Sequence, residues 1–514
     1  MADFSIKNWT RLFAKGKSDL GKVVLQSGYR LAGAAAMAAL LLLHRTWPVP
    51  AATVVGTLLL SLIGGMMLHA HFKTVEPDRA KRNKIDQLVW FTSLIAVGGL
   101  QVANLSIDPE AQSRVGFLLM APLVAQAMLV GSLATPGIGM AGLSMSVLLL
   151  GLIGALPIDL AAGTFLAGAV AAHAVNPLKQ RSDLIRAMSV QAAVQALICA
   201  CMAFVMPQFT LAPWEAALWG AIAAVIATAV FWLGVAVVEK MFGITSDWTL
   251  LELGSPEHPL IRELVLRAPG TYAHSVGVAN LAESAAREID ANPLLCRTMA
   301  YFHDIGKTAR PGYFIENQVG DNVHDDLSPS LSAQIIAAHV TDGVDLAKKH
   351  KLPQTIVDGI EQHHGTSLIT YFYHRAVEEK VLAPSQESEK KFRYPGPKPQ
   401  TKEAALLHLA DVVEAASRVA PRDQSLDLFV ANLIEKSRAD GQLDESDLTF
   451  KDLGVICESF CRTLRAVRHQ RIDYPTDSPV SAIGAEFQLD HGGRESEEPP
   501  SRERGEPPAQ AESR

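Results

Sequence analysis

The hydrophobic pattern divides the chain into two halves. Residues 31–238 are almost continuously apolar, with charges confined to short gaps, whereas the sequence beyond about 240 has the mixed pattern of a soluble protein. An apolar run of 18 or more residues indicates a membrane-spanning helix. The sequence predicts eight such segments, the sixth of them short: 31–47, 51–71, 88–106, 115–133, 137–156, 159–176, 186–206 and 214–238.

Positive charges between these segments predict their orientation. Lys and Arg gather in the leader before the first segment, in the gap after the second and in the gap after the sixth. Basic gaps stay on the cytoplasmic side of a membrane. Eight spans put every basic gap and both termini there, whereas seven would export the second half. We therefore expect a multi-pass protein of the bacterial cytoplasmic (inner) membrane, inserted in the lipid bilayer. Reading the first segment as a cleaved signal peptide is disfavoured by its long leader.

The second half shows mostly helical apolar spacing from 272 to about 470 and no convincing alternating strands, which predicts an all-α domain. We expect a basic cytoplasmic leader at 1–30, a transmembrane helical domain at 31–240 and a connector at 241–268. A catalytic helical domain then follows at 269–476, and a disordered tail at 477–514. Thr271 is a plausible helix cap, and the charged, proline-rich stretch 377–402 is expected to run over the surface.

Composition narrows the classes of function. At 514 residues the chain is too long for one ordinary domain. Its five cysteines support no disulfide scaffold, because two lie in an apolar segment and three on the cytoplasmic side. The net charge of −7 and the lack of a basic stripe with interleaved aromatic residues predict no nucleic-acid polymer as a partner.

Candidate chemistry is concentrated in seven side chains of the second half. Imidazole and carboxylate ligands in this mixture suit first-row divalent metals such as Mn, Fe, Co, Ni or Zn. Seven are more than one ion usually takes, and two neighbouring ions are a common device for hydrolysing phosphate esters. The residues are His274, His303, Asp304, His339, His363, His364 and Asp411.

Their placement on predicted helices favours a shared site. His303 and Asp304 end a buried helix, and adjacent residues on a helix point about 100° apart. Asp304, with two oxygens, is the member of that pair able to bridge two ions. Ala273 and Gly277 leave room beside His274 for close approach. Asp411 lies in an apolar helix, where an unpaired carboxylate would be costly.

Each of these residues has a simpler interpretation when taken alone. A single buried histidine such as His339 is more often a hydrogen-bonded core residue, and a buried aspartate can be one half of an ion pair. The combination, with a His-Asp dipeptide followed by Gly306-Lys307, favours metal binding. His324, His350, His374 and His408 are taken as ordinary residues, although His374 lies near the charged stretch and could reach a substrate phosphate.

These motifs resemble the seven-transmembrane HD phosphodiesterases, the PgpH-type enzymes that hydrolyse cyclic di-AMP. The resemblance covers most of residues 255–420. The motifs that carry it are Pro269-Gly270-Thr271-Tyr272-Ala273-His274-Ser275, Tyr301-Phe302-His303-Asp304-Ile305-Gly306-Lys307-Thr308, Phe314-Ile315-Glu316-Asn317-Gln318, Ala338-His339-Val340-Thr341-Asp342-Gly343, Glu361-Gln362-His363-His364-Gly365-Thr366 and Arg393-Tyr394-Pro395-Gly396-Pro397-Lys398.

The resemblance implies a metal-dependent phosphodiesterase with an HD-domain fold. One divalent ion would be held by His274, His303, Asp304 and Asp411, and the other by Asp304, His339, His363 and His364; Mn or Fe is expected. A metal-activated hydroxide would attack phosphorus and yield linear pApA. We expect Lys307 to stabilise the phosphate electrostatically. In the family a large extracytoplasmic domain follows the first span, whereas here only residues 45–50 stand in that place.

Two other functions remain open at this point, as does a homodimer. The first is hydrolysis of cyclic di-GMP by an HD-GYP-type enzyme, although His364 is followed by Gly365-Thr366-Ser367 and not by that family's Gly-Tyr-Pro signature. The second is a membrane receptor that binds a nucleotide without hydrolysing it. The complete set of metal ligands argues against this second function, because a binding module has no need of two metals.

Overall fold

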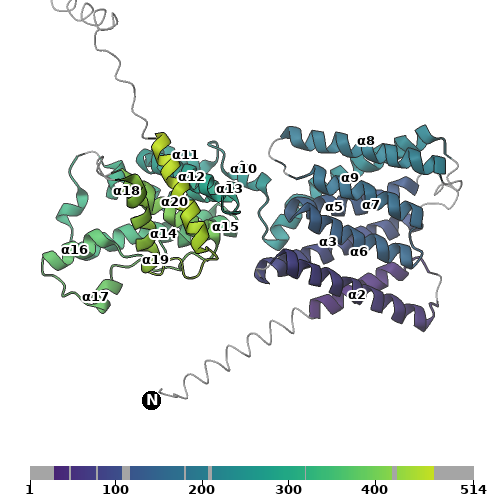
Figure 1. The fold of residues 1–514 in the computed structure, drawn as a ribbon, viewed down its shortest axis with the longest axis horizontal. Helices are drawn as coiled ribbons and strands as arrows, with labels where there is room; N and C mark the ends of the chain where they lie inside the picture. Colours follow the sequence, from purple (N-terminus) through teal and green to yellow (C-terminus); the bar gives the residue numbers. More distant parts are fainter. Residues whose placement is uncertain are drawn as a thin grey trace, which may run out of the picture. The chain divides into compact units, whose positions relative to one another are not determined.

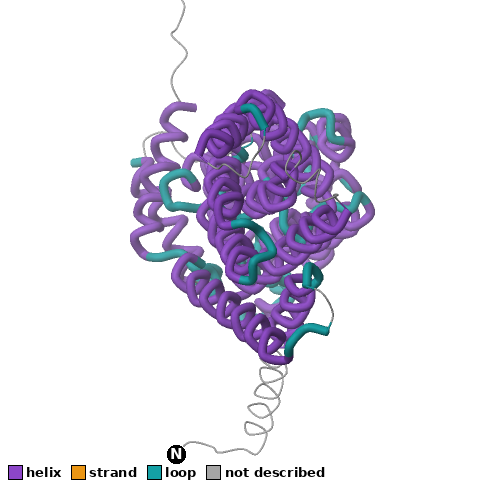
Figure 2. The backbone as a smooth tube through the Cα atoms, turned by 90° about the vertical axis from the view of Figure 1, so that its right-hand side faces the viewer, coloured by secondary structure: helices purple, strands orange, loops and turns teal. Residues whose placement is uncertain are grey.

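The computed structural model describes residues 28–45, 48–76, 79–106, 116–176, 178, 181–205, 211–318, 320–418 and 425–467. Over these residues the backbone consists of helices and loops (Figure 2), with one isolated bridge between Leu368 and Arg393. The predicted all-α class is therefore confirmed. The predicted tail at 477–514 and residues 1–27 of the predicted leader lie outside the described part.

Each of the eight predicted apolar segments contains a helix. Five of the helical segments are long and apolar enough to cross a membrane, and three are shorter apolar helices. That all eight cross the membrane stays a prediction. The longer ones are α2 (Ala51–Val75), α3 (Arg79–Ser106), the 3-10 turn η1 (Gly116–Met120) continued by α5 (Ala121–Leu133), α8 (Arg181–Val205) and α9 (Pro213–Phe242). The shorter ones are Gly28–Leu42, α6 (Pro136–Leu152) and α7 (Ile158–Ala174).

Helix α5 is the centre of the apolar bundle. It packs against α3, α6, α7 and α9, and nearly all of its side chains are buried. Small residues allow close helix contact, as they do in membrane proteins generally. A Cβ added to Gly139 of α6 would lie 2.8 Å from the carbonyl oxygen of Ala127 in α5, and one added to Gly220 of α9 would lie 2.8 Å from that of Gln195 in α8.

The second half contains mostly shorter helices (Figure 1), and four 3-10 turns lie among the described residues between 305 and 326. The predicted connector is itself helical, and its two helices pack on the residues that follow. Helix α10 (Asp247–Leu253) packs on α13 (Pro293–Phe302), and α11 (Pro259–Arg267) packs on α12 (Pro269–Ala286). The elements are α10 (Asp247–Leu253), α11 (Pro259–Arg267), α12 (Pro269–Ala286), α13 (Pro293–Phe302), η2 (Ile305–Ala309), η3 (Pro311–Tyr313), η4 (Ile315–Asn317), η5 (Val323–Asp326), α14 (Pro329–Lys349), α15 (Gln354–Gln362), α16 (Thr370–Glu378), α17 (Gln386–Lys390), α18 (Lys402–Ser417), α19 (Leu426–Ala439) and α20 (Phe450–Val467).

Five of these helices form the core that carries the candidate ligands. Helix α12 packs against α13 and α18, and α15 packs against α13, α14 and α18. Their inward faces bury apolar side chains such as Val278, Phe302, Ile360 and Leu409, all fully or almost fully excluded from solvent. This core fixes the relative positions of the segments that carry the candidate ligands.

Two sequence-based predictions about this half were wrong. Thr271 is not a helix cap, because α12 begins two residues earlier, at Pro269, and proline is favoured at the first helical position. The amide nitrogens of Gly270 and Thr271 instead donate to Oδ1 of Asn317. The surface excursion predicted over 377–402 holds only for its first part, since Phe392 is 1% exposed and the chain then returns to the candidate site.

Candidate metal centre

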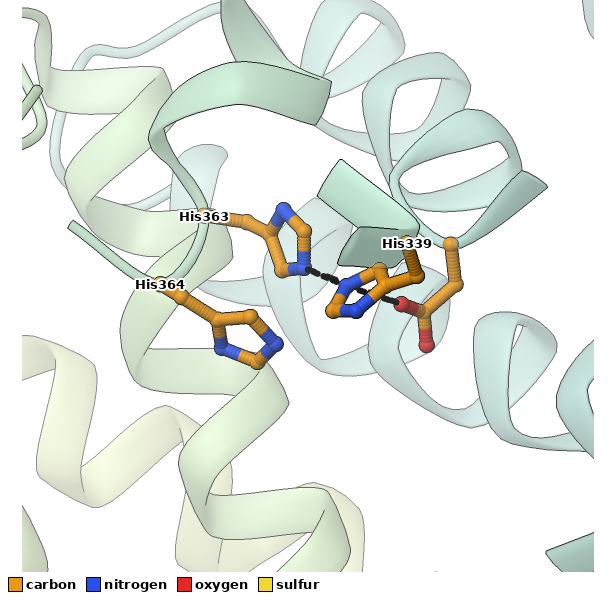
Figure 3. Close-up of side chains that lie close together, drawn as sticks. His339, His363 and His364 are labelled. Carbon is orange, nitrogen blue, oxygen red and sulfur yellow. Dashed lines mark hydrogen bonds and ion pairs between the residues drawn. The ribbon is translucent and has the colours of Figure 1, made fainter. Parts of the chain in front are cut away.

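All seven predicted ligands lie in one cluster, mostly at helix ends. His303 and His363 directly follow the last residues of α13 and α15, so Asp304 and His364 come just after these helices. His274 lies in the second turn of α12, His339 in the middle of α14 and Asp411 in α18. Their nitrogen and oxygen atoms form three overlapping groups that could hold a metal ion, each spanning less than 4.8 Å. Figure 3 shows the rings of His339, His363 and His364 close together.

Asp304 lies between the two sets of ligands. Its Oδ2 is 3.2 Å from Nε2 of His303 and 3.7 Å from Nε2 of His274. Its Oδ1 is 3.2 Å from Nε2 of His339 and 3.7 Å from Nε2 of His363. Each carboxylate oxygen therefore faces a different pair of imidazoles, which is the geometry that a bridging ligand requires.

Asp411 lies close to a histidine of each set. Its Oδ1 lies 2.9 Å from Nε2 of His274, and its Oδ2 lies 3.5 Å from Nδ1 of His364. Asp411 is almost fully buried. Burial alone would raise the pKa of this carboxyl, but its bond to His274 and the nearby imidazoles hold that pKa well below its usual range.

Backbone carbonyls orient three of the histidines in the same way. Nδ1 of His303 donates to the carbonyl of Ala300 at 2.6 Å, Nδ1 of His339 to Ile336 at 2.6 Å, and Nδ1 of His363 to Ile360 at 2.8 Å. In each case the acceptor lies three residues earlier in the chain. Because Nδ1 carries the proton, a neutral ring has its lone pair on Nε2, the atom that faces the cluster. These histidines are thus arranged as metal ligands.

The donor set fits divalent metals. Nε2 of His303 and Oδ1 of Asp304 are buried and make no hydrogen bond of good geometry within the described residues, an arrangement that normally costs free energy. Burial lowers the pKa of His363 to about 4, although Asp304 opposes the shift, and burial also holds the pKa of His364 well below its usual range. Both rings are therefore neutral near pH 7, as metal ligands must be.

Comparison with known proteins gives two family matches along the chain. Residues 271–416 match the HD domain, and residues 51–246 match the family described as 7TM receptor with intracellular HD hydrolase. This chain is a 7TM-HD protein. The HD match lies within the helical half and the 7TM match mostly within the apolar half, whereas the domain bounds themselves stay a prediction.

Relatives of this 7TM-HD protein include two proteins named cyclic-di-AMP phosphodiesterase PgpH. The Bacillus subtilis protein is 51% identical over 240 residues, and the Listeria monocytogenes protein is 44% identical over 253 residues. These alignments cover 46% and 48% of this chain but only 33% and 35% of the relatives. A crystal structure of the L. monocytogenes PgpH HD domain in complex with cyclic di-AMP is 43% identical, covers 41% of this chain and 99% of that one, and has a TM-score of 0.39.

Lys307 of the HD domain is bound to carboxylates. Its Nζ lies 2.7 Å from Oδ2 of Asp304 and 2.8 Å from Oε1 of Glu316, and the side chain is 12% exposed. Glu316 also accepts a bond from the hydroxyl of Thr271. Lys307 and Glu316 therefore link α12, which carries His274, to Asp304. Sequence reasoning identified Lys307 but did not predict these partners.

Glu414 belongs to the site and was not predicted. Its Oε2 accepts from Nδ1 of His274 at 2.5 Å, and its Oε1 accepts from Nη2 of Arg418 at 2.7 Å. The space beside Gly277, predicted to allow close approach, is filled by this carboxylate, because an added Cβ would lie 2.8 Å from Oε1. The available signal was spacing, since Glu414 lies three residues after Asp411 and so on the same face of α18.

Tyr394 covers the His364 side of the cluster. Its ring stacks on that of His364, with centroids 4.1 Å apart and planes 25° apart. The amide of Tyr394 donates to the carbonyl of Ser367, and the amide of Gln400 donates to the side chain of Gln362. The Tyr394–Gln400 segment is thus attached at both ends to the residues around the His363-His364 pair.

The four histidines taken as ordinary residues are not members of the three metal-ligand groups. His408 is buried and donates from Nδ1 to the carbonyl of His363 at 2.7 Å, so it supports the chain at a ligand. His324 binds the carbonyl of Tyr313. His374 packs edge-on against Tyr373 in α16, and its predicted reach to a substrate phosphate is untested.

Proposed function

We propose that the chain is a membrane-anchored, metal-dependent phosphodiesterase that hydrolyses cyclic di-AMP to linear pApA. The observation that carries the proposal is the position of Asp304, whose two oxygens face two separate sets of ligands. The choice of substrate is supported by the 51% identity to the B. subtilis PgpH over 240 residues.

The metal ligands follow from the two sets. One divalent ion would be held by His274, His303, Asp304 and Asp411, and the other by Asp304, His339, His363 and His364, with Mn or Fe as the expected metals. Bound ions of this kind lower the pKa of a coordinated water and neutralise charge on phosphate oxygens. The protein itself supplies the ligands and shields them from solvent. Its buried core excludes bulk water from the Nε2 atoms of His303 and His363, both 0% exposed.

Lys307 has a double role in this proposal. A lysine ammonium has three N–H donors, and two of them face Asp304 and Glu316. At most one donor is left for a substrate phosphate. We therefore assign Lys307 chiefly to the positioning of Asp304, with its charge adding to the electrostatic stabilisation of the phosphate.

The membrane half would anchor this site to the cytoplasmic face. Five helical segments are long and apolar enough to span a bilayer, and we propose that the three shorter ones span it as well. The distribution of Lys and Arg then places residues 241–476 in the cytoplasm. A C-terminal fusion to a reporter that is active only in the cytoplasm should be active, and a fusion to one that is active only outside the cytoplasm should not. The reverse pattern of activities would mean that the catalytic half lies outside the cytoplasm.

The proposed activity is tested with the purified full-length chain in detergent or nanodiscs, loaded with Mn²⁺. Cyclic di-AMP, cyclic di-GMP and the mixed cyclic dinucleotide are incubated in parallel and the products separated by chromatography. We expect pApA from cyclic di-AMP at the highest rate. A faster reaction with cyclic di-GMP would reassign the base, and metal-dependent binding without any product would favour a receptor.

A further inference from the structure

We propose that Glu414 is a positioning residue that fixes the ring of His274 for metal binding, and that Arg418 in turn holds Glu414. His274 differs from His303, His339 and His363 in one respect. Their Nδ1 atoms donate to backbone carbonyls of their own helices, whereas Nδ1 of His274 donates to a carboxylate from another helix, 140 residues away. On the Nδ1 side, the orientation of this ligand therefore depends on a side chain and not on a backbone carbonyl.

The contact between Glu414 and His274 favours one orientation of the imidazole ring. Glu414 is 9% exposed and His274 is 6% exposed. Because a carboxylate can only accept, Nδ1 carries the proton in its bond to Oε2. Nε2 then faces Asp411 at 2.9 Å and Asp304 at 3.7 Å. Loss of the carboxylate would let the ring rotate or carry its proton on Nε2, the atom that the metal needs.

Arg418 limits the positions that Glu414 can take. Its Nη2 and Nε lie 2.7 and 2.9 Å from Oε1 of Glu414, and Nε also lies 3.1 Å from Oε2. Oε1 accepts the two shorter bonds from Arg418, and Oε2 accepts its shortest bond from His274. The absence of a side chain at Gly277 leaves the space that the carboxylate occupies.

This arrangement predicts opposite effects for two related substitutions. In Glu414→Gln the single amide oxygen would pair with Arg418, so the NH₂ group would face Nδ1 of His274. Because an NH₂ group can only donate, Nδ1 would become an acceptor and the ring proton would move to Nε2. Removing Arg418 as well, in Glu414→Gln with Arg418→Met, would free the amide to rotate and present its oxygen to Nδ1 again.

The test measures Mn²⁺ affinity of the full-length chain by competition with a chelator, without any substrate. Loss of such supporting contacts typically weakens metal binding about 10–100-fold. We expect this loss in Glu414→Ala and Glu414→Gln, and recovery towards wild type in the double variant. The matched control is Glu435→Ala, which removes the carboxylate of an exposed Glu–Arg pair on α19 and should bind Mn²⁺ as wild type does.

The possible results separate the role of Glu414 from the proposed metal-dependent function. The inference rests on the proposed metal-dependent function: if wild type takes up no Mn²⁺, that function fails. If wild type binds Mn²⁺ and Glu414→Ala or Glu414→Gln binds it equally well, only the role of Glu414 is overturned. Should Glu414→Ala not fold, Glu414→Gln is compared with the double variant. Binding that is no stronger in the double variant than in Glu414→Gln would show a structural role, because a damaged fold is not repaired by removing a second contact.

Discussion

Nζ of Lys307 lies 2.7 Å from Oδ2 of Asp304, the carboxylate oxygen that also faces His303 and His274. Burial alone would raise the pKa of Asp304, but the ammonium of Lys307 and the imidazole of His303 outweigh it and hold this pKa well below its usual range. The carboxylate is therefore charged, and ready to bind cations, before any metal arrives.

The charge of Lys307 should matter most when metals are absent. Removing one partner of a buried ion pair typically costs about 3–5 kcal/mol, and bound metal ions would supply the missing positive charge. We expect Lys307→Met to lower the melting temperature of the metal-free protein strongly and that of the Mn²⁺-loaded protein less. Thermal unfolding with and without Mn²⁺ measures this. Lys402→Met, which removes a partly exposed pair with Asp452, is the control, and an equal loss in both states would contradict the prediction.

Metal affinity should rise with pH above neutrality because of His274. Burial lowers the pKa of this ring, but bonds to Asp411 and Glu414 outweigh it and raise the pKa to about 10. The metal-free ring is thus protonated near pH 7, and metal must displace that proton. One displaced proton changes the affinity about tenfold per pH unit, between pH 7 and the folded pKa.

The raised pKa of His274 also makes the stability of the metal-free protein depend on pH. The stabilisation from the charged ring is present below about pH 6.5, the unfolded pKa, and is lost as the pH rises through about 10. Chelator competition for Mn²⁺ at pH 7.0, 7.75 and 8.5 measures the affinity, and His274→Asn should flatten the slope. An affinity of wild type that does not change over this range would refute the assignment.

Two glycine substitutions should have opposite effects. Alanine favours a helix over glycine by about 1 kcal/mol, so Gly454→Ala in α20, with open space around the added Cβ, should raise the melting temperature. In Gly277→Ala the Cβ would meet Glu414 at 2.8 Å, and we expect weaker Mn²⁺ binding together with little or no gain in stability. A Gly277→Ala protein with full Mn²⁺ affinity would show that the carboxylate can shift without cost.

The ring of Tyr394, and not its hydroxyl, should support His364. Aromatic stacking of this kind contributes about 0.5–1.5 kcal/mol, or roughly a two- to tenfold effect on an equilibrium at 1.4 kcal/mol per factor of ten. We expect Tyr394→Phe to retain Mn²⁺ affinity and Tyr394→Leu to lose it by that factor. Titration of the metal-free variants with Mn²⁺ tests this, and equal affinities of the two variants would exclude a role for stacking.

The apolar helices and the seven clustered residues could be predicted from the sequence because their signals are local. That the seven residues bind metal stays a prediction. Long apolar runs indicate helices regardless of what surrounds them, and the adjacent His303 and Asp304 point in different directions by helix geometry alone. The bridging position of Asp304 was inferred in this way, and its two oxygens do face different ligands.

The parts that were missed depend on contacts between distant segments. Glu414 looks like an ordinary helical glutamate, and only the packing of α12 on α18 brings it to His274. Tyr394 follows a charged stretch that is typical of a surface loop, and its return to His364 requires the anchors at Ser367 and Gln362. Thr271 is of a residue type that often caps helices, but the helix already begins at Pro269.

We propose that Asp304 organises a metal centre that cleaves a cyclic dinucleotide. The most direct measurement is chromatography of the products formed from cyclic di-AMP by the Mn²⁺-loaded full-length chain and by its Asp304→Ala variant. We predict that the wild type forms pApA and that the Asp304→Ala variant forms none. A cooperative unfolding transition of the variant shows that it is folded. Equal amounts of pApA from both proteins would show that cleavage does not require Asp304.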